Sequence, residues 1–507
     1  MNTAHTSPRA NIPLGLTFFL TVLGMATLFA LSKPLAMADL GVYLRMGTWM
    51  LEHQRLLTHE PFSLAVLDMP FQNGTWASQG VFALLFKLGG YPAIQMLLAS
   101  AVGLTLVVTG LHIRSATSAS WMGAGALLAF FALLQNLAIR PQTFSLVGFA
   151  LTWMLLERRP TWKATPALLF LIFVLWANLH GAFPVTFAIP AAFGLEALAR
   201  AYSPLPGDKV VPPALAASFS RWGVLGACMV AGSLFNPDGP KLYLYIMENS
   251  SMPATRGLDE WLAPTPLSFM GGRLYLALLV LAWIGWKARA HLRLGELLLV
   301  GIYGVLALGS VRMIVWFGLV AAVVGLRWGW ACRQANPPPP PVPDPGAARL
   351  HTGLGIGVLA LFALLFVKSW PGDADAKGPD GDYPNLDPET PVKVATWLEA
   401  HPGGRTFCRF EWGSYFLWRL WPQTQPFLDI RLWQYDDALW QTYLETGQGR
   451  GDWEAVLSRF QLQTLVLSVE TQSGLIQAAQ QNPAWKETYR DASAVVFTRA
   501  GAPEGSP

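Results

Sequence analysis

Asp39 is the first acidic residue in this chain, and its carboxylate could carry out acid–base chemistry. It follows the first long apolar segment, in a stretch from Lys33 to Ser63 that is too polar to cross a bilayer. Tyr43 lies four residues further on, so the two side chains share one face of a helix. The pattern predicts a helix on the membrane surface with Asp39 as a catalytic carboxylate, and a helix-capping or solvated aspartate is the alternative. The apolar residues expected to rest on the membrane are Leu40, Leu44, Met46, Trp49, Met50 and Leu51.

Other polar groups stand at the ends of further apolar segments, all on the same predicted side of the membrane. They are Arg140, Asn178, His180, Asp238, Glu260, Trp261 and Arg312. Charged and amide groups at the ends of membrane helices are costly unless they are paired or wetted. Their convergence therefore predicts one polar, water-accessible cavity that opens on the extracytoplasmic side.

Each of these groups also has a purely structural interpretation. The Arg140 side chain can extend to the membrane interface, and His180 can join two helices through a hydrogen bond. Arg312 can form a structural ion pair with Asp39 or Glu260. The residues alone leave these alternatives open.

The composition is that of a membrane protein with one soluble part. Of 507 residues, 53% are apolar and 13% are charged, whereas soluble domains carry about 25% charged residues. The apolar part ends near residue 370, and residues 371–507 have a soluble composition. Basic residues cluster in short loops between apolar runs, which indicates membrane topology and no nucleic-acid partner. The three cysteines lie far apart, so a disulfide framework or zinc site is not expected.

About eleven apolar runs are long enough to span a bilayer. They cover residues 12–32, 91–112, 119–137, 142–157, 165–180, 183–200, 219–236, 273–289, 294–310, 312–331 and 350–369. With the N-terminus in the cytoplasm, every loop predicted to be inside is basic, which agrees with the positive-inside rule. The first outside loop then covers 33–90, where Phe82 to Leu88 is predicted to form a second short helix, ended by Gly89 and Gly90.

These spans imply two domains. Residues 1–333 are expected to form the membrane domain, followed by a proline-rich cytoplasmic linker at 334–349 and the last span at 350–369. Residues 371–389 are expected to be a flexible exit on the outside, leading to a domain at 390–500.

Residues 390–500 alternate between helical and strand patterns, which predicts a small, largely parallel sheet with flanking helices. Strands are expected at 405–410, 426–430, 464–469 and 494–499. No phosphate-binding loop, nucleophile elbow or metal-ligand spacing occurs in this part. Asp429 and Arg431 flank Ile430 on a predicted strand and are interpreted as a structural ion pair.

Ten short segments, in this order and spacing, carry a resemblance to a known family. They are residues 39–44, 47–53, 60–63, 140–145, 176–181, 236–239, 260–261, 312, 411–415 and 427–431. Together they resemble bacterial polytopic proteins related to the C-superfamily of membrane glycosyltransferases, the GT-C fold. The resemblance covers nearly the whole chain. It implies an all-α polytopic membrane domain of about eleven helices and a C-terminal extracytoplasmic α/β domain.

The resemblance also implies an activity in the bacterial inner membrane. A sugar would pass, with inversion, from a polyprenyl-phosphate donor to an envelope glycan, lipid or protein acceptor on the extracytoplasmic side. Asp39 would be the general base, while Arg140, His180 and Arg312 would bind the donor phosphate. Further substrate contacts are expected from Tyr43, Gln79, Asn178, Glu260 and Trp261. Membrane lipid is the other expected partner.

The chain departs from the family pattern around Tyr43 and at Ser78 and Gln79. Either the chemistry depends on Asp39 alone, or this copy has lost activity. Two other functions therefore stay open: a non-catalytic scaffold in envelope assembly and a transporter of lipid-linked glycans. A scaffold predicts a cavity filled by side chains, and a transporter predicts a polar path to the cytoplasmic side. A divalent cation is the only cofactor left open.

Overall fold

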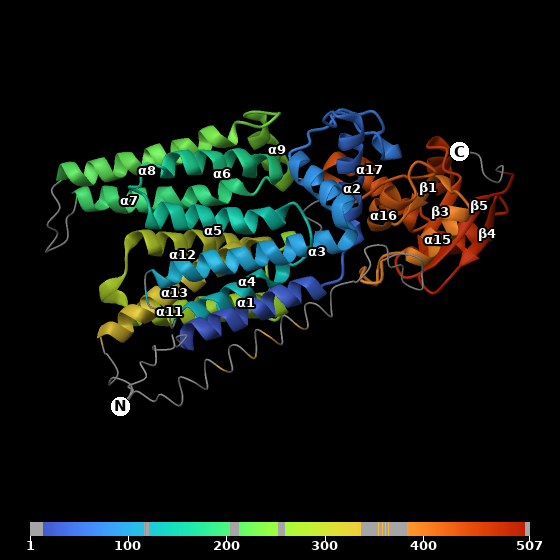
Figure 1. Ribbon diagram of the computed structural model, residues 1–507. Coiled ribbons are helices and arrows are strands. Elements are labelled where there is room, and N and C mark those ends of the chain that lie inside the picture. The colour runs from blue at the N-terminus through green and yellow to red at the C-terminus, as the bar shows by residue number, and fades with distance from the viewer. Residues whose placement is uncertain are drawn as a thin grey trace, which may run out of the picture.

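The computed structural model describes residues 14–335 and 383–501, except 116, 118–120, 203–211 and 252–258, and four isolated positions between 353 and 364. The predicted linker and last span fall almost entirely outside the described residues, as does the predicted exit up to residue 382. Residues 383–389 of that exit are not flexible as expected, because Asn385 and Asp387 form backbone hydrogen bonds with Leu35. Two bodies are visible in Figure 1, an elongated bundle of helices and a compact C-terminal domain at one end of it.

The bundle consists of apolar helices that lie side by side (Figure 1). They are α1 (Leu14–Ser32), α3 (Trp76–Arg114), α4 (Met122–Leu133), α5 (Gln142–Arg158), α6 (Thr165–Leu179), α7 (Ala188–Tyr202), α8 (Pro212–Ser233), α11 (Phe269–Lys287), α12 (Leu294–Gly309) and α13 (Ile314–Ala335). Leu175 and Leu279 are 65% and 69% exposed on its outer surface. Helices that are apolar on both their inner and outer faces belong in a membrane.

Four described helical segments are long and apolar enough to cross a bilayer: Gly15–Ser32, Trp76–Arg114, Phe269–Lys287 and Val311–Ala335. Several of the remaining apolar helices are shorter. The chain is thus a membrane protein, while the expected number of eleven spans and their orientation remain predictions.

The helix expected around Asp39 is α2 (Met37–His53), which lies between the end of the bundle and the C-terminal domain (Figure 1). The expectation that its apolar face rests on the membrane is wrong. Of the six residues predicted to do so, Leu51 is 47% exposed and the other five are buried in protein. Periodicity identified the apolar face correctly but could not show that protein, not lipid, covers it.

Two glycines of α2 explain how closely it is packed. A Cβ at Gly41 would lie 2.5 Å from the backbone oxygen of Ser414 in the C-terminal domain. A Cβ at Gly47 would lie 2.0 Å from the backbone oxygen of Gln79 on α3. Real Cβ atoms do not approach this closely, so both glycines are needed for α2 to fit between its neighbours.

The predicted short helix ending at Gly89 and Gly90 is confirmed as the first part of α3. The backbone is non-helical at both glycines, with φ of +60° at Gly90, a conformation that glycine adopts without steric cost. The chain therefore turns at this point before it enters the bundle.

The C-terminal domain contains a five-stranded sheet. Its strands are β1 (Gly404–Cys408), β2 (Thr424–Pro426), β3 (Thr464–Ser468), β4 (Trp485–Arg490) and β5 (Ala494–Arg499), and its helices are α15 (Val392–Ala400), α16 (Phe410–Arg419), α17 (Asp437–Gly447), α18 (Trp453–Arg459) and α19 (Ser473–Gln481). The strand order is β2-β1-β3-β5-β4. β1 pairs in parallel with β2 and β3, while β5 is antiparallel to both β3 and β4.

The expectation of a largely parallel sheet is therefore only half correct. The sequence did not predict β4, whose side chains are mostly exposed and polar, because an edge strand lacks the apolar alternation of a buried one. The strand predicted at 426–430 ends at Pro426, and the chain leaves the sheet before Asp429.

Asp429 and Arg431 form the expected ion pair and extend it to the outside loop. The Arg431 guanidinium contacts Asp429 at 2.6 Å and Glu60 at 2.5 Å. All three side chains are buried. Glu60 also accepts hydrogen bonds from the backbone N–H groups of Phe62 and Ser63. This cluster joins the loop after α2 to the C-terminal domain.

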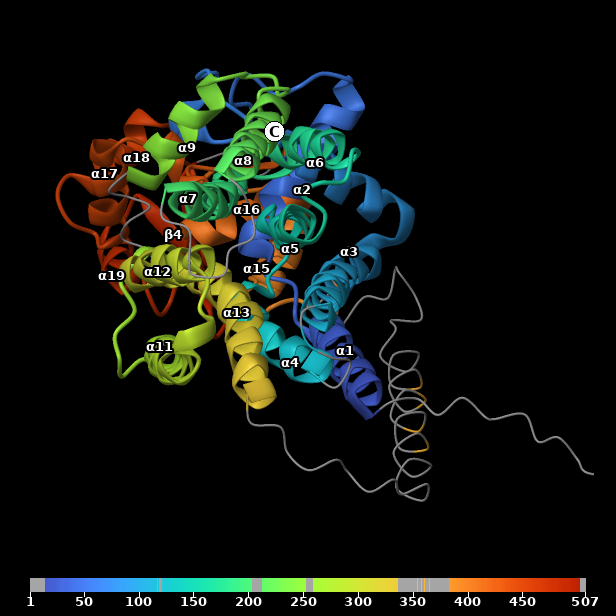
Figure 2. The same cartoon turned by 90° about the vertical axis from the view of Figure 1, so that its left-hand side faces the viewer.

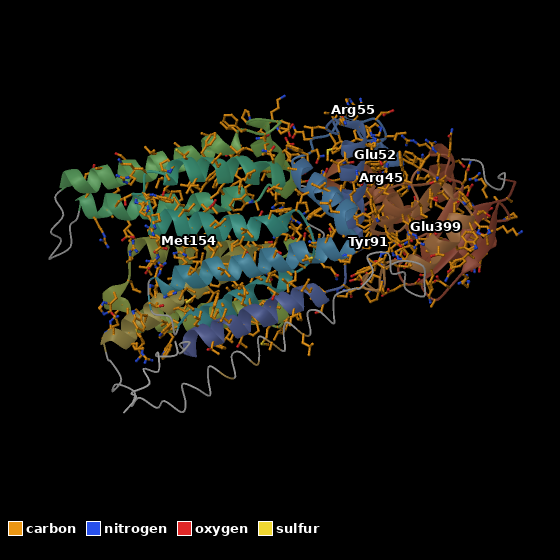
Figure 3. All side chains as sticks on the ribbon, in the orientation of Figure 1. Arg45, Glu52, Arg55, Tyr91, Met154 and Glu399 are labelled. Carbon is orange, nitrogen blue, oxygen red and sulfur yellow. The ribbon has the colours of Figure 1, made fainter. Side chains whose placement is uncertain are left out.

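A second contact fixes the domain to α3. The Trp418 indole N–H donates to the Tyr91 hydroxyl at 3.0 Å, and Tyr91 lies at the junction of the two bodies in Figure 3. The C-terminal domain is thus held over the end of the bundle from two sides.

Candidate active site

A cavity of about 790 Å³ lies where the end of the helical bundle meets the C-terminal domain. Seven of the nine predicted site residues line it together: Asp39, Tyr43, Arg140, His180, Glu260, Trp261 and Arg312. They come from segments far apart in the sequence. The predicted convergence of polar groups on one cavity is therefore present in the structure.

Four charged side chains form an alternating row across this cavity. The Arg140 Nε atom lies 2.8 Å from the Asp39 Oδ2 atom, and its Nη1 atom lies 2.9 Å from Glu260 Oε2. Glu260 Oε1 lies in turn 3.2 Å from Arg312 Nη1. The row contains two carboxylates and two guanidiniums, so its formal charges cancel and each charged side chain has a partner of opposite charge.

Local structure places each member of the row. Asp39 is in the first turn of α2, where a carboxylate also suits the positive end of the helix. Arg140 precedes Pro141, which begins the turn into α5. Glu260 and Arg312 lie on two short 3₁₀ helices, η5 (Asp259–Trp261) and η7 (Val311–Met313).

The two 3₁₀ helices are tied together. The backbone N–H of Val311 donates to the Leu262 carbonyl, and the Ser310 hydroxyl donates to the Glu260 carbonyl, each at 3.0 Å. The Arg312 guanidinium lies 4.8 Å from the centre of the Trp261 ring, a favourable cation–π distance. These contacts hold the Arg312 charge at the cavity wall.

The charged row is partly open to the cavity. The side chains of Asp39 and Arg312 are 18% and 25% exposed, and those of Glu260 and Arg140 are 33% and 35% exposed. Burial raises the pKa of the Asp39 carboxyl, while the nearby Arg140 guanidinium acts to lower it. In return, the charge of Asp39 raises the pKa of Arg140. Burial and the Asp39 charge both raise the pKa of Tyr43.

His180 is fixed by a hydrogen-bonded chain behind the cavity wall. Its Nδ1 atom lies 2.8 Å from the Ser145 hydroxyl, which accepts a bond from the Trp176 indole N–H at 2.7 Å. Since the Ser145 oxygen accepts the Trp176 indole N–H, the Ser145 hydroxyl can donate its own proton to Nδ1 of His180. This arrangement favours the tautomer with the proton on Nε2, which leaves a donor for the cavity.

Asn178 and Gln79 do not line the cavity. The Asn178 side-chain oxygen accepts a hydrogen bond from the Trp76 indole N–H at 2.8 Å, and its side-chain NH₂ group donates to the Phe235 backbone carbonyl at 2.8 Å. The Gln79 side chain exchanges two hydrogen bonds with Asn73. Both amides therefore join chain segments, and their predicted contact with substrate has no support from their position.

The C-terminal domain contributes residues to which sequence reasoning assigned no role. Arg409, Glu411 and Glu389 line the cavity from this side. The Arg409 guanidinium contacts Glu411 at 3.0 Å and Glu389 at 3.5 Å. Arg409 follows β1 directly, and the carboxyl ends of parallel strands are common places for binding sites. The position of Arg409 directly after a predicted strand is the sequence signal that could have identified it as a site residue.

The described residues contain no group of three or more His, Cys, Asp and Glu side chains that could hold a metal ion. Asp39 and Glu260, the two carboxylates of the charged row, share Arg140 as a partner. A guanidinium between two carboxylates does not suit a divalent cation, because its positive charge already occupies the position between them.

Comparison with known proteins shows the fold. No protein-family model and no curated protein matches the chain. The archaeal oligosaccharyltransferase AglB from Archaeoglobus fulgidus, solved with an inhibitory peptide and a dolichol-phosphate, is similar over 96% of this chain and 74% of its own, with a TM-score of 0.52 and 11% identity. Structures of the Archaeoglobus fulgidus enzyme in the apo form and with Zn and sulfate give TM-scores of 0.50 and 0.53, each at 11% identity, and cover 96% and 95% of this chain and 75% and 73% of theirs. This chain shares the fold of these oligosaccharyltransferase structures.

Proposed function

We propose that the protein is a membrane glycosyltransferase that moves a sugar from a polyprenyl-phosphate donor to an envelope glycan, lipid or protein acceptor on the extracytoplasmic side of a bacterial inner membrane. The observation that carries this proposal is the open cavity in which Asp39 stands beside two guanidiniums. The fold supports it, since a neighbour of the same fold was solved with a dolichol-phosphate and a peptide.

In the proposed reaction Asp39 is the general base. Its carboxylate takes the proton of an acceptor hydroxyl while that oxygen attacks the anomeric carbon from the side opposite the phosphate. The bond between the anomeric carbon and the phosphate oxygen breaks, the phosphate keeps the electron pair, and the configuration is inverted. Burial suits Asp39 to this role, because a raised pKa makes its carboxylate a better proton acceptor.

Arg140 and Arg312 are proposed to stabilise the departing phosphate. Both guanidiniums contact Glu260. The phosphate gains a second negative charge as its bond to the sugar breaks, and it offers more acceptor oxygens than this carboxylate, so it can replace Glu260 as their partner. The Nε2 donor of His180 is available to the same group.

Two observations weigh against the other functions considered. A scaffold would fill the cavity with side chains, but the cavity is open. A transporter would need a polar path between the ends of the bundle. A buried cluster at the far end does contain His112, Glu157, Arg327 and Glu296, but these residues pair with one another. Aromatic rings connect this cluster to the cavity wall: the Trp153 ring lies against His112, and the Phe149 ring lies against both Trp153 and Trp316, which lines the cavity.

The proposal is tested with purified protein in lipid nanodiscs and a panel of polyprenyl-phosphate sugars with candidate acceptors. Asp39→Asn is expected to bind the donor and to lose transfer, because the amide cannot accept the proton. Arg140→Gln and Arg312→Gln are expected to weaken donor binding. Glu52→Gln is the matched control, since Glu52 lies on the same helix with its side chain 53% exposed and outside the cavity. Well-folded wild type that binds no donor would refute the proposal.

A further inference from the structure

A second cavity, of about 1000 Å³, lies between α4, α11 and α13. Figure 2 shows α13 between α11 on one side and α4 on the other. The walls are mostly apolar side chains of α4 and α11, and small residues of α13, including Gly318, Ala321 and Gly325, form the floor. We refer to this cavity as the α11 groove. It shares no lining residue with the candidate active site.

The α11 groove follows the membrane-spanning length of its helix. The 19 residues of α11 correspond to about 28 Å, close to the thickness of the hydrocarbon layer. Arg273 and Gln135 line the groove at the end near the candidate active site, where Gln135 donates to the Val311 carbonyl. Lys287 and Arg289 line it at the opposite end, with His291 beside them.

The cations at that opposite end of the bundle fall into two groups. Arg327 contacts both Glu157 and Glu296, and Arg293 contacts Glu196 at 3.4 Å. By contrast, no carboxylate of the described residues lies within salt-bridge distance of Lys287 or Arg289. Lys287 and Arg289 instead lie over the Trp286 ring, at 5.3 and 5.7 Å from its centre.

We infer that the α11 groove binds an anionic phospholipid, with its phosphate at Lys287 and Arg289 and its acyl chains along α13. The charges of the groove are complementary to such a lipid, because an apolar channel ends at cations that have no counter-ion among the residues the structure describes. Basic pockets between membrane helices on the cytoplasmic side recognise anionic head groups in this way. A zwitterionic lipid fits less well, since its ammonium group would meet two positive side chains. This inference does not depend on the proposed enzymatic activity.

The inference is tested by native mass spectrometry of the delipidated full-length protein in detergent, offered phosphatidylglycerol and phosphatidylcholine with the same acyl chains. Wild type is expected to retain phosphatidylglycerol in preference. The double variant Lys287→Gln/Arg289→Gln is expected to lose this preference by roughly thirty-fold, since each basic residue near an anionic lipid contributes about fivefold. The double variant Arg159→Gln/Lys163→Gln is the matched control, because it removes two exposed cations at the same end that do not line the groove.

Two further variants separate the two parts of the site. Ala321→Phe places a ring on the groove floor and is expected to reduce binding of both long-chain lipids while the charges remain. Arg273→Gln is expected to leave the preference unchanged, because the phosphate is assigned to the other end. Equal retention of the two lipids by wild type would overturn the inference. So would an unchanged preference in the Lys287/Arg289 variant, or its loss in the Arg273 variant.

Discussion

The buried cluster of Arg431, Glu60 and Asp429 allows a quantitative test of how the C-terminal domain is held. Arg431→Met keeps most of the side-chain volume but leaves two buried carboxylates without their shared cation. The three side chains are at most 1% exposed, so water does not replace the lost partner. Removing one member of a buried ion pair typically costs about 3–5 kcal/mol. We expect Arg431→Met to destabilise the protein by at least this amount, because two carboxylates lose their partner at once.

Arg419→Met is the matched control, because it makes the same substitution in the same domain. Arg419 is 9% exposed, but its partner Glu399 is 48% exposed and lies away from the bundle in Figure 3, so water solvates the carboxylate when the guanidinium is removed. Exposed pairs contribute about 0–1 kcal/mol. Thermal unfolding in detergent, read by circular dichroism and by protease cleavage of the C-terminal domain, measures both variants. Equal melting of Arg431→Met and Arg419→Met would refute the view that the buried cluster holds the domain in place.

Three further predictions concern packing and protonation. Gly41→Ala is expected to lower the free energy of unfolding by about 1–3 kcal/mol, since the new Cβ would meet the Ser414 carbonyl at 2.5 Å. Gly80→Ala is the control and should not destabilise the protein, because nothing lies within 4 Å of its Cβ position. Equal unfolding temperatures of the two variants would contradict this prediction. Arg140→Gln removes the group that lowers the pKa of Asp39, so the acidic limb of the pH–rate profile should move to higher pH; a shift in the opposite direction would exclude Asp39 as the base. Folding raises the pKa of Asp39. At pH values between the unfolded and the folded pKa, the native state therefore binds more protons than the unfolded state. The stability of the protein then falls as pH rises through that window. Asp39→Asn should therefore melt higher than wild type at neutral pH but not in acid, and the same difference at both pH values would count against a raised pKa.

Sequence reasoning worked best where a local pattern is sufficient. The strand expected at 494–499 coincides with β5, and the turn at Gly89 and Gly90 is present. Apolar runs also gave the approximate positions of most bundle helices, because lipid exposure and burial both require apolar residues. The ends of these runs then placed seven of the nine candidate residues at one cavity.

Errors arose where a contact partner lies far away in the chain. The apolar face of α2 was assigned to lipid because nothing near it in sequence announces α16, some 370 residues later. Arg409 and Glu411 were given no role for the same reason. The family resemblance implied that Gln79 and Asn178 contact substrate, yet amides also bond to their own neighbours, and here they do so. Residue type and position along a helix do not decide between these partners.

The sequence also could not predict which charged side chains of the row contact one another, and this pairing matters for the proposed mechanism. Arg140 contacts both Asp39 and Glu260, so the base and the phosphate site share one cation. A donor phosphate that draws Arg140 toward itself weakens the only close positive contact of the Asp39 carboxylate among the described residues. The pKa of Asp39 then rises further, and the carboxylate becomes a stronger base. Under the proposed function, donor binding therefore promotes removal of the acceptor proton.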